Sequence, residues 1–329
     1  MNYNNVLVTG GAGYIGSHAV NSLLQSGRNV VVIDKDKEAC DSLRDMYRKR
    51  KGLKVYCADF SNDIYIDGIL SNEKIEAVMH FAADVSVEES SRNPLKYYYN
   101  NTAKTIELLE RLIRKGIYRF IFSSTAAVYG MPNNSENITE DTVCRPINAY
   151  GNSKLMTEHV LKKMSDSIPA FKYTTFRYFN VAGMEITGKV SDYRWRERQN
   201  IIPKYLQVLS AGKNKVNIYG TDYKTPDGTC IRDYIHPEDI ISAHMIALDD
   251  DIEGVYNLGS SSGYSVWDIV ENCVAVTGLE IDANHLPRRK GDPPILVANS
   301  EKFQKLTGWE PNYTLKEMIA SAWYSYCKS

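Results

Sequence analysis

The sequence predicts an α/β fold built on a doubly wound parallel sheet, followed by a smaller C-terminal region. Short apolar runs alternate with helical segments as far as Asn180, which is the pattern of a parallel sheet with helices on both faces. A glycine-rich turn separates the first apolar run from the first helical segment. After Asn180 the alternation gives way to longer loops rich in Gly, Asp, Lys and Pro, and a length of 329 residues suits about two domains.

The first expected strand, Asn5–Thr9, is a short apolar run of the kind found in buried parallel strands. The helical segment after it, "YIGSHAVNSLLQSG", ends at Gly27, where a C-terminal cap belongs. The other elements expected in this half follow the same rhythm: a strand at Asn29–Asp34, a helix around Lys37–Arg50, a strand in "LKVYCAD", a helix near Asp63–Ser71, a strand in "EAVMHFA", a long helix at Leu95–Lys115, a strand in "RFIFSS", a helix that contains Tyr150 and a strand in "KYTTFRYFN".

Composition and charge exclude several classes of protein. A net charge of −1 gives no electrostatic reason to expect nucleic-acid binding. The N-terminus lacks the pattern of a secretory signal, and no apolar run approaches the roughly 18 residues of a membrane span. The six cysteines form no C-x-x-C pair, so we expect reduced, mostly buried thiols in a cytoplasmic protein. The six histidines show no metal-ligand spacing, so no metal site is expected.

The glycine-rich turn "TGGAGYIG" predicts a dinucleotide site. Gly10, Gly13 and Gly16 stand between a strand and a helix, where glycines permit a tight turn and close approach of a diphosphate to the helix N-terminus. Asp34 ends the second strand and can accept hydrogen bonds from the adenosine ribose, which favours NAD over NADP. Asp59 follows the third strand and is placed to meet the adenine amino group. The alternatives are a glycine turn without a ligand and, for Asp59, an ordinary turn residue.

The stretch "INAYGNSKLMTEH" predicts a helix that begins with poor helix formers. Asn148 is a suitable N-cap, and the next turns contain Gly, Asn and Ser, which form helices less readily than Ala. Tyr150 and Lys154 are four residues apart and therefore share a helix face. We interpret this face as reactive, with the small residues between them allowing cofactor and strand to approach closely.

Six segments, in order along the chain, resemble those of extended short-chain dehydrogenase/reductases and most closely the UDP-glucose 4-epimerase family. They are "TGGAGYIG", "HFAADVSVEES", "SSTAAVYG", "YGNSK", "RYFNVAG" and "DGTCIRDYIHPED". The resemblance covers nearly the whole chain. It implies a Rossmann-like fold and an NAD-dependent enzyme that inverts C4 of a UDP-hexose, UDP-glucose or UDP-galactose, through a transient 4-keto sugar. The alternatives are 4-epimerisation of another UDP-sugar (an N-acetylhexosamine, pentose or uronate) and a non-catalytic NAD-binding sensor.

The resemblance implies that Tyr150 is the base that takes the proton from the sugar 4-OH. A free tyrosine has a pKa near 10, and a nearby ammonium favours the phenolate. Lys154 is expected to lower the pKa of Tyr150, and a shift of about three units corresponds to roughly 4 kcal/mol. In the family this lysine also binds the nicotinamide ribose.

Thr125 stands where the family has a serine or threonine that hydrogen-bonds the 4-oxygen and relays the proton. Ser123 and Ser124 precede it at the strand end, where a backbone-capping role is the simpler interpretation. In the related sugar-nucleotide 4,6-dehydratases an Asp-Glu pair follows the threonine. Here Ala126 and Ala127 follow it, so elimination of water is not expected.

Further cofactor contacts are implied by the resemblance. His80 could be mistaken for a base, but at a strand end beside a cofactor we interpret it as structural. The cofactor set comprises Gly10, Gly13, Tyr14, Ile15, Gly16, Asp34, Asp59, Phe60, Phe81, Ala82, Ala83, Asn100, Ser123, Tyr150, Lys154 and Tyr178.

The substrate set lies in the second half, apart from Thr125 and Tyr150. Arg232 and Arg289 resemble diphosphate clamps, for which a forked guanidinium is suited, with surface ion pairs as the alternative. Asp292 matches a ligand of the uridine ribose. The others are Asn180 and Asn200, which resemble diphosphate or sugar contacts, and Tyr219, which matches the residue beside uracil.

Several positions depart from the family pattern. Glu88 replaces a glycine, and Val85 stands where some members have a lysine that contacts the cofactor. Leu296 occupies a gatekeeper position where a small residue leaves room for an N-acetyl group. Leucine is intermediate and leans toward an unacetylated UDP-hexose. The basic, aromatic loop Gly188–Gln199 is either solvated or adds phosphate contacts.

We expect residues 1–180, with a return of the chain near 230–260, to form the NAD-binding domain, and residues 181–329 to form mainly the UDP-sugar-binding region. Family dimers pair the long helix with the Tyr150 helix, which implies a homodimer. An apolar stripe permits such a face but is equally what core packing requires. It consists of Leu95, Tyr99, Thr102, Ile106, Leu109 and Ile113.

Overall fold

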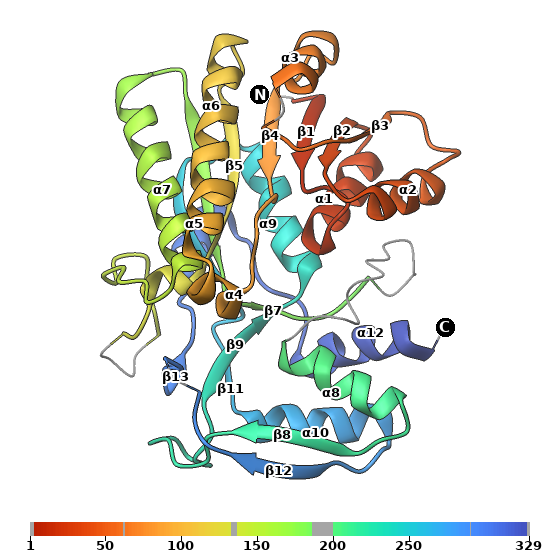
Figure 1. The fold of residues 1–329 in the computed structure, drawn as a ribbon, viewed down its shortest axis with the longest axis vertical. Helices are drawn as coiled ribbons and strands as arrows, with labels where there is room; N and C mark the ends of the chain where they lie inside the picture. The colour runs from red at the N-terminus through yellow and green to blue at the C-terminus, as the bar shows by residue number, and fades with distance from the viewer. Residues whose placement is uncertain (1–2, 62, 133–136, 186–199, 290, 328–329) are drawn as a thin grey trace. The chain divides into compact units, whose positions relative to one another are not determined.

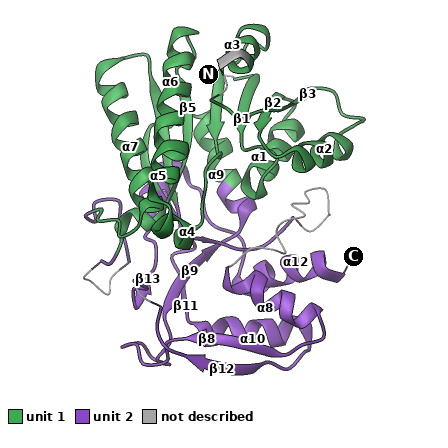
Figure 2. Ribbon diagram, viewed as in Figure 1, with its two compact units in different colours: residues 1–130, 144–177, 241–256 green, residues 131–143, 178–240, 257–329 purple. Residues whose placement is uncertain are grey.

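The structure, a computed structural model, describes residues 3–61, 63–132, 137–185, 200–289 and 291–327. The chain divides into two compact units (Figure 2). Unit 1 comprises residues 1–130, 144–177 and 241–256, and unit 2 comprises residues 131–143, 178–240 and 257–329. The loop Gly188–Gln199 lies outside the described residues, so its predicted alternatives stay untested.

A seven-stranded sheet forms the centre of unit 1 and confirms the predicted doubly wound α/β class (Figure 1). The chain runs outward from β1 through β2 to β3, returns to the other side of β1 as β4, and continues outward through β5 and β6. The neighbours in the stretch from β5 to β3 pair in parallel. The direction of winding therefore reverses between β1 and β4, which is where doubly wound sheets bind ligands. The order is β10 (Gly254–Leu258), β6 (Lys172–Tyr178), β5 (Arg119–Thr125), β4 (Ala77–His80), β1 (Asn5–Thr9), β2 (Asn29–Asp34), β3 (Leu53–Cys57).

Helices cover this sheet because its strands are apolar on both faces. Leu7, Val31 and Val78 belong to a core cluster that includes buried residues of α3, α6 and α7. The alternate residues Val8 and Val32 are equally buried and point to the opposite face. The helices of this part are α1 (Tyr14–Gln25), α2 (Lys37–Met46), α3 (Asp63–Asn72), α4 (Val87–Arg92), α5 (Pro94–Tyr97), the π-helix η1 (Tyr98–Ala103), α6 (Lys104–Arg114), the 3₁₀ turn η2 (Ala126–Tyr129), α7 (Ala149–Ser167) and α9 (Pro237–Asp249).

The long helix predicted at Leu95–Lys115 is not one regular α-helix, because the π-helix η1 interrupts it. Side chains of η1 bond to α7 instead of facing solvent: Thr102 Oγ1 donates to Ser153 O at 2.9 Å, and Asn101 Nδ2 donates to Ser153 Oγ at 3.1 Å. Such π segments are rare and often accompany functional sites.

The interruption also divides the predicted apolar stripe. Leu95, Tyr99 and Ile106 are 78%, 59% and 42% exposed, whereas Thr102 and Leu109 are buried. The stripe is therefore partly exposed and partly buried, because a π-turn changes the angular spacing of the residues that follow it, and neither a dimer face nor core packing accounts for all of its residues.

Helix α7 lies close against the segment after β5. Asn148 caps it as predicted, since its side chain accepts a hydrogen bond from Gly151 N at 2.8 Å. A Cβ atom on Gly151 would lie 2.5 Å from Ala127 O, so glycine is required there. This agrees with the interpretation that a small residue lets neighbouring chain approach.

A buried ion pair fastens the same helix to the sheet. Glu158 of α7 accepts from Arg177 of β6, with Arg177 Nη2 at 2.6 Å from Glu158 Oε2. Ser124 also donates to Glu158, so its predicted backbone-capping role was wrong. Tyr129 OH accepts from Arg177 Nη1 at 2.9 Å. Burial lowers the pKa of Arg177, but the nearby Glu158 carboxylate outweighs it and raises the pKa.

Unit 2 contains a four-stranded sheet centred on β9 and a separate two-stranded sheet, β12–β8 (Figure 1). β9 pairs with β11, β13 and β7. The elements are β7 (Asn180–Val181), α8 (Ile201–Ser210), β8 (Lys215–Tyr219), β9 (Ile231–Ile235), β11 (Gly263–Tyr264), α10 (Val266–Thr277), β12 (Asp282–Leu286), β13 (Ile295–Leu296), α11 (Glu301–Thr307) and α12 (Leu315–Cys327).

The cysteines are less buried than expected. Cys40 and Cys273 are buried, whereas Cys57 and Cys327 are exposed and the other two are half-buried. All six lie in described segments, and none forms a disulfide. Among the helices that the structure describes, none has the length and apolarity needed to cross a membrane.

Candidate active site

The glycine turn after β1 owes two of its glycines to the fold itself. Gly10 has φ +69°, and a Cβ atom there would lie 2.6 Å from Ala82 N, in the segment after β4. A Cβ atom on Gly16 would collide with the carbonyl oxygen of Gly10. The turn is therefore too tightly packed, against itself and against the end of β4, for any larger residue.

Gly13 is less crowded than Gly10 and Gly16, although a Cβ atom there would still be a tight fit. Its φ is −81°, and a Cβ atom would meet only Gly10 O, at 3.3 Å. Gly13 is the N-cap of α1, yet no side chain caps this helix end and no acidic residue lies in its first turn. Neither a capping side chain nor an acidic first-turn residue therefore offsets the positive end of the dipole of α1, an arrangement that fits a dinucleotide diphosphate. Tyr14 and Ile15 are the first residues of α1.

Two carboxylates end the strands beside this turn. Asp34 Oδ2 accepts from Ala12 N at 3.2 Å, which ties the glycine turn to the end of β2. Asp59 follows β3, and its carboxylate accepts from Lys104 Nζ at 2.5 Å and from Ser61 N at 3.0 Å. Burial raises the pKa of Asp59, but these hydrogen bonds outweigh it and lower the pKa. Asp59 thus remains a charged acceptor, already engaged by Lys104.

The end of β4 holds a neutral histidine. His80 Nδ1 lies 2.7 Å from Thr9 Oγ1, and Nε2 lies 3.2 Å from Thr105 Oγ1. Burial, followed by the charge of Lys154, lowers the pKa of His80 to about 3. With both ring nitrogens engaged, this residue is a structural link. The remaining predicted cofactor residues lie as follows: Phe60 is buried after β3, Phe81, Ala82 and Ala83 follow β4, Asn100 is buried in η1, and Tyr178 ends β6.

Tyr150 and Thr125 are brought together at the end of β5. Burial raises the pKa of Tyr150, and a hydrogen bond with Thr125 opposes this shift. Thr125 Oγ1 also accepts from Ala127 N at 3.1 Å, which orients the hydroxyl group. The ring of Tyr97 packs edge-on against Tyr150, with 6.5 Å between ring centroids.

Lys154 is buried and points to the strand rather than to solvent. Its Nζ donates to Ser123 O at 2.7 Å and lies 4.7 Å from the centre of the Phe122 ring. Burial lowers the pKa of Lys154 to about 7, against an upward influence of Glu158. Lys154 does not oppose the raised pKa of Tyr150 in this structure, so the expected lowering by Lys154 together with the positive nicotinamide ring stays a prediction. The ammonium is committed to a strand carbonyl, and desolvation dominates the pKa of both groups.

The predicted substrate residues of unit 2 form two pairs. Arg232 Nη2 lies 3.5 Å from Asp292 Oδ1. The guanidinium carbon of Arg289 lies 4.0 Å from the centre of the Tyr219 ring. The other three predicted positions are Leu296 of β13, in register with Arg232 of β9, Asn180, which begins β7, and Asn200, the N-cap of α8, whose side chain makes no capping bond.

Several residues that support this site escaped the sequence analysis. Asn101 bonds both the chain after β4 and Ser153, and Ser153 Oγ donates in turn to Tyr150 O at 2.8 Å. Glu158 and Arg177 were also missed. The paired asparagines of "YYYNNTAK" inside a predicted helix were the available signal, because asparagine is a poor helix former.

The sheet order, the glycine turn at its switch point and a tyrosine four residues before a lysine on α7 define an extended short-chain dehydrogenase/reductase. The sequence model described as "NAD dependent epimerase/dehydratase family" matches residues 6–259, and the chain belongs to this family.

Individual relatives agree with this assignment. The chain is 42% identical to the UDP-glucose 4-epimerase of Lactobacillus helveticus, over 97% of this chain and 96% of the relative. It resembles the crystal structure of UDP-glucose 4-epimerase from Stenotrophomonas maltophila with bound NAD and formylated UDP-arabinopyranose, with 32% identity and a TM-score of 0.92 over 99% and 98% of the two chains. It also resembles the UDP-Glc/GlcNAc 4-epimerase of Campylobacter jejuni, with 40% identity and a TM-score of 0.82 over 99% of each chain.

Substitution of Gly13 and substitution of Gly16 are expected to affect NAD binding and thermal stability differently. Gly13→Ala is expected to lose less thermal stability than Gly16→Ala but to lower the NAD content of the purified protein at least about tenfold, because the added methyl group lies in the space expected for the diphosphate and makes only one tight contact with the fold. Gly16→Ala is expected to lower the unfolding temperature as well, because the methyl group collides with the turn itself.

Thermal unfolding and the NAD content of the purified proteins distinguish the two variants. Equal loss of stability in both would contradict the division of roles between Gly13 and Gly16.

Proposed function

We propose that this protein inverts C4 of a UDP-hexose, interconverting UDP-glucose and UDP-galactose through a transient 4-keto sugar, with tightly held NAD. The proposal rests chiefly on the closeness of Tyr150, on α7, to Thr125, at the end of β5, beside the buried Lys154, together with the full-length similarity to UDP-glucose 4-epimerases. The nicotinamide ring, when bound, supplies the acceptor for the hydrogen at C4 and a positive charge.

The residues of unit 1 have distinct roles in this reaction. Tyr150 takes the proton of the 4-OH and returns it once the configuration at C4 has changed. Thr125 donates to the phenolic oxygen, which favours the phenolate and opposes the effect of burial. Lys154, fixed by Ser123 O, places a group with a pKa of about 7 in the buried site, where a modest change in local charge changes its protonation.

The family includes dehydratases as well as epimerases, so the choice between them needs a separate argument. Elimination of water requires an acid and a base beside the sugar. The two residues after Thr125 are Ala126 and Ala127, which can supply neither. Ala127 is also packed against Gly151, where a Cβ atom would lie 2.5 Å from Ala127 O. These positions favour epimerisation.

We assign the anchoring of the UDP group to the two pairs in unit 2. Arg232 and Arg289 offer forked donors to the diphosphate, Asp292 an acceptor to the uridine ribose, and Tyr219 an aromatic face to the uracil ring. On this assignment residues 1–180, with the return near 230–260, bind NAD, and residues 181–329 mainly bind the UDP-sugar.

A second substrate class is favoured by one comparison. The Campylobacter jejuni relative carries both UDP-Glc and UDP-GlcNAc in its name. Leu296 lies in register with Arg232, and its intermediate size leans toward the unacetylated sugar. We therefore rank UDP-N-acetylhexosamine second.

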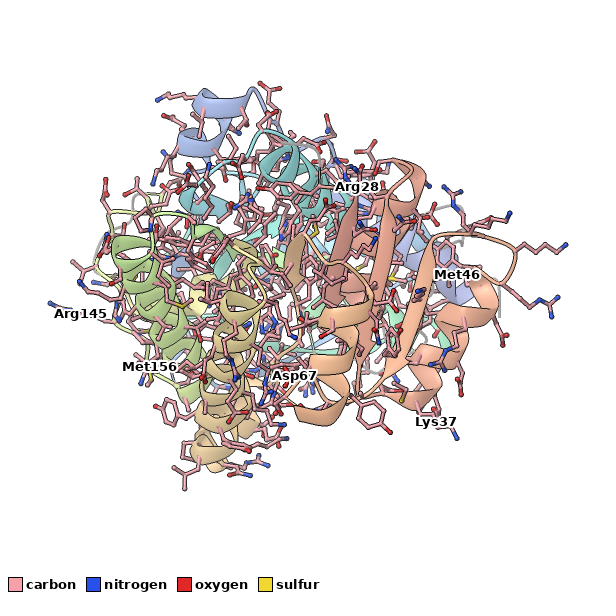
Figure 3. The ribbon with its side chains drawn as sticks, turned by 90° about the horizontal axis from the view of Figure 1, so that it is seen from above. Arg28, Lys37, Met46, Asp67, Arg145 and Met156 are labelled. Carbon is pink, nitrogen blue, oxygen red and sulfur yellow. The ribbon has the colours of Figure 1, made fainter. Side chains whose placement is uncertain are left out.

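We further propose that the enzyme works as a homodimer in the cytoplasm. Large apolar side chains are exposed on two helical segments. Leu95, Tyr99 and Ile106 lie on the segment from α5 to α6. Met156, labelled in Figure 3, lies on α7. Pairing these segments in a second copy would remove this apolar surface from water. Six cysteines without a disulfide suit a reducing compartment.

The purified protein is expected to convert UDP-galactose to UDP-glucose without added NAD. Tyr150→Phe is expected to lower kcat by about 10²- to 10⁴-fold, because proton transfer contributes on this scale, and to leave NAD content and folding unchanged. Product formation followed by chromatography checks both. A near-normal rate in Tyr150→Phe would refute its role, and turnover of UDP-N-acetylglucosamine in place of UDP-galactose would establish the second substrate class.

Leu95→Glu is expected to convert the dimer to a monomer, because a charge in an apolar interface loses its hydration. Leu306→Glu is the matched control, since Leu306 is 56% exposed on α11, in the other unit. Light scattering coupled to size-exclusion chromatography measures the mass. If both variants keep the wild-type mass, the proposed interface is wrong.

A further inference from the structure

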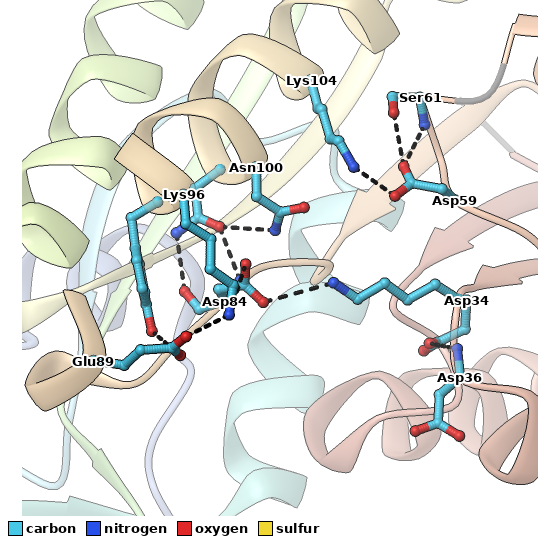
Figure 4. A network of polar contacts seen from close by, with 12 residues as sticks. Asp34, Asp36, Asp59, Ser61, Asp84, Glu89, Lys96, Asn100 and Lys104 are labelled. Carbon is cyan, nitrogen blue, oxygen red and sulfur yellow. Dashed lines mark hydrogen bonds and ion pairs between the residues drawn. The ribbon is translucent and has the colours of Figure 1, made fainter. Parts of the chain in front are cut away.

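One ion pair crosses the edge of the sheet where the predicted cofactor site lies. The loops after β2 and after β4 flank the glycine turn, because β1 lies between these two strands. Adjacent strands are about 4.8 Å apart, so the ends of β2 and β4 are separated by roughly 10 Å. Lys35 spans this separation: its Nζ lies 3.6 Å from Asp84 Oδ1 (Figure 4).

The Asp84 end of this pair is rigidly anchored. Asp84 N donates to Asn101 Oδ1 at 2.9 Å, and Asn101 Nδ2 donates back to Asp84 O at 2.9 Å. Asn101 is buried and also bonds Ser153 of α7. Lys96 Nζ lies 4.0 Å from Asp84 Oδ2 (Figure 4). Asp84 is thus fixed to the helix that carries Tyr150.

The Lys35 end is the more exposed of the two. Its side chain is 61% exposed, whereas that of Asp84 is 17% exposed. Lys35 directly follows Asp34, the residue expected to bind the adenosine ribose, and Asp36 caps the next helix through Ala39 N at 3.0 Å. The backbone on both sides of Lys35 is therefore held, and its flexible side chain alone reaches across the turn, on the solvent side.

We propose that Lys35 and Asp84 form a clasp over the bound dinucleotide and slow its release. A dinucleotide that extends from Asp34 to Tyr150 along the carboxyl edge of the sheet passes beneath this pair, so the pair must open before the ligand leaves. The closed clasp lets the site retain its cofactor between turnovers. The inference rests on NAD as the cofactor and is independent of the sugar.

The ionic character of the clasp sets the size of the effect. An exposed ion pair changes an equilibrium by up to about fivefold, and salt screens it, with a Debye length of about 10 Å at 0.1 M and 3 Å at 1 M. Breaking the clasp should thus speed release by about two- to fivefold at low salt and have little effect at 1 M salt.

The test measures release of NAD from the purified holoenzyme without sugar, with a large excess of an alcohol dehydrogenase and ethanol to convert released NAD to NADH. The proteins are the wild type, Lys35→Ala, Asp84→Asn, the double variant and Lys37→Ala. Lys37 is the matched control, because it is an exposed lysine at the start of α2 (Figure 3) whose removal changes the charge equally.

The clasp predicts that Lys35→Ala and Asp84→Asn each release NAD about two- to fivefold faster, that the double variant is no faster than either, and that Lys37→Ala matches the wild type. Release from Lys35→Ala at the wild-type rate would overturn the proposal. So would a normal rate in Asp84→Asn beside a fast Lys35→Ala, which would mean that Lys35 attracts the diphosphate directly. If Asp84→Asn fails to fold, Asp84→Ala, which keeps the two backbone hydrogen bonds with Asn101, takes its place with the same expected and the same contradicting rates. None of these outcomes depends on which sugar is epimerised.

Discussion

The contact of helix α7 with β5 is the constraint on which the site of unit 1 depends. Gly151 brings the backbone of the helix close to Ala127 O, and Lys154 reaches from the helix to Ser123 O at 2.7 Å. Further along the helix, Glu158 accepts from Ser124 of β5 and Arg177 of β6. Each of these contacts needs the helix at the same distance from the strand. Tyr150 therefore meets Thr125 because the whole helix is held in place.

Burial of Lys154 at this contact lowers the stability of the fold, and the same burial shifts the pKa of groups in the reactive site. Lys154 has a pKa of about 7, well below that of a solvated lysine, so the folded state binds its proton less readily than the unfolded chain. Its contribution to stability consequently falls as the pH drops from about 10.4 to about 7, and changes little below that. Burial also raises the pKa of Tyr150. The protein alone thus favours the neutral forms of both groups, and the charges of bound ligands can redistribute the proton between them.

Local sequence predicted the parts of the fold that local chemistry determines. The bounds of β1 and β2 match the prediction, because each is an apolar run that ends at a residue of distinct character, glycine after Thr9 and Asp34 itself. The start of α7 was predicted from Asn148, whose side chain caps the helix as asparagine does in isolated peptides.

The remaining features depend on partners distant in sequence. The π-helix η1 forms where Asn101 and Thr102 bond to Ser153 of α7, which is more than fifty residues away in the sequence. The apolar periodicity of the segment therefore could not predict it. The direction of the Lys154 ammonium also depends on tertiary contacts, because its partner lies on β5. The Lys35–Asp84 pair depends on the sheet order, which places the ends of β2 and β4 on either side of β1. The pairing of Arg232 with Asp292 likewise required the sheet around β9.

In the proposed reaction, hydrogen leaves C4 of the sugar and returns to the same carbon within one site. The decisive experiment is the conversion, in ordinary water, of UDP-galactose that carries deuterium at C4. We expect UDP-glucose that retains deuterium at C4, as measured by mass spectrometry and NMR. Replacement of the deuterium by solvent hydrogen during the conversion would contradict it.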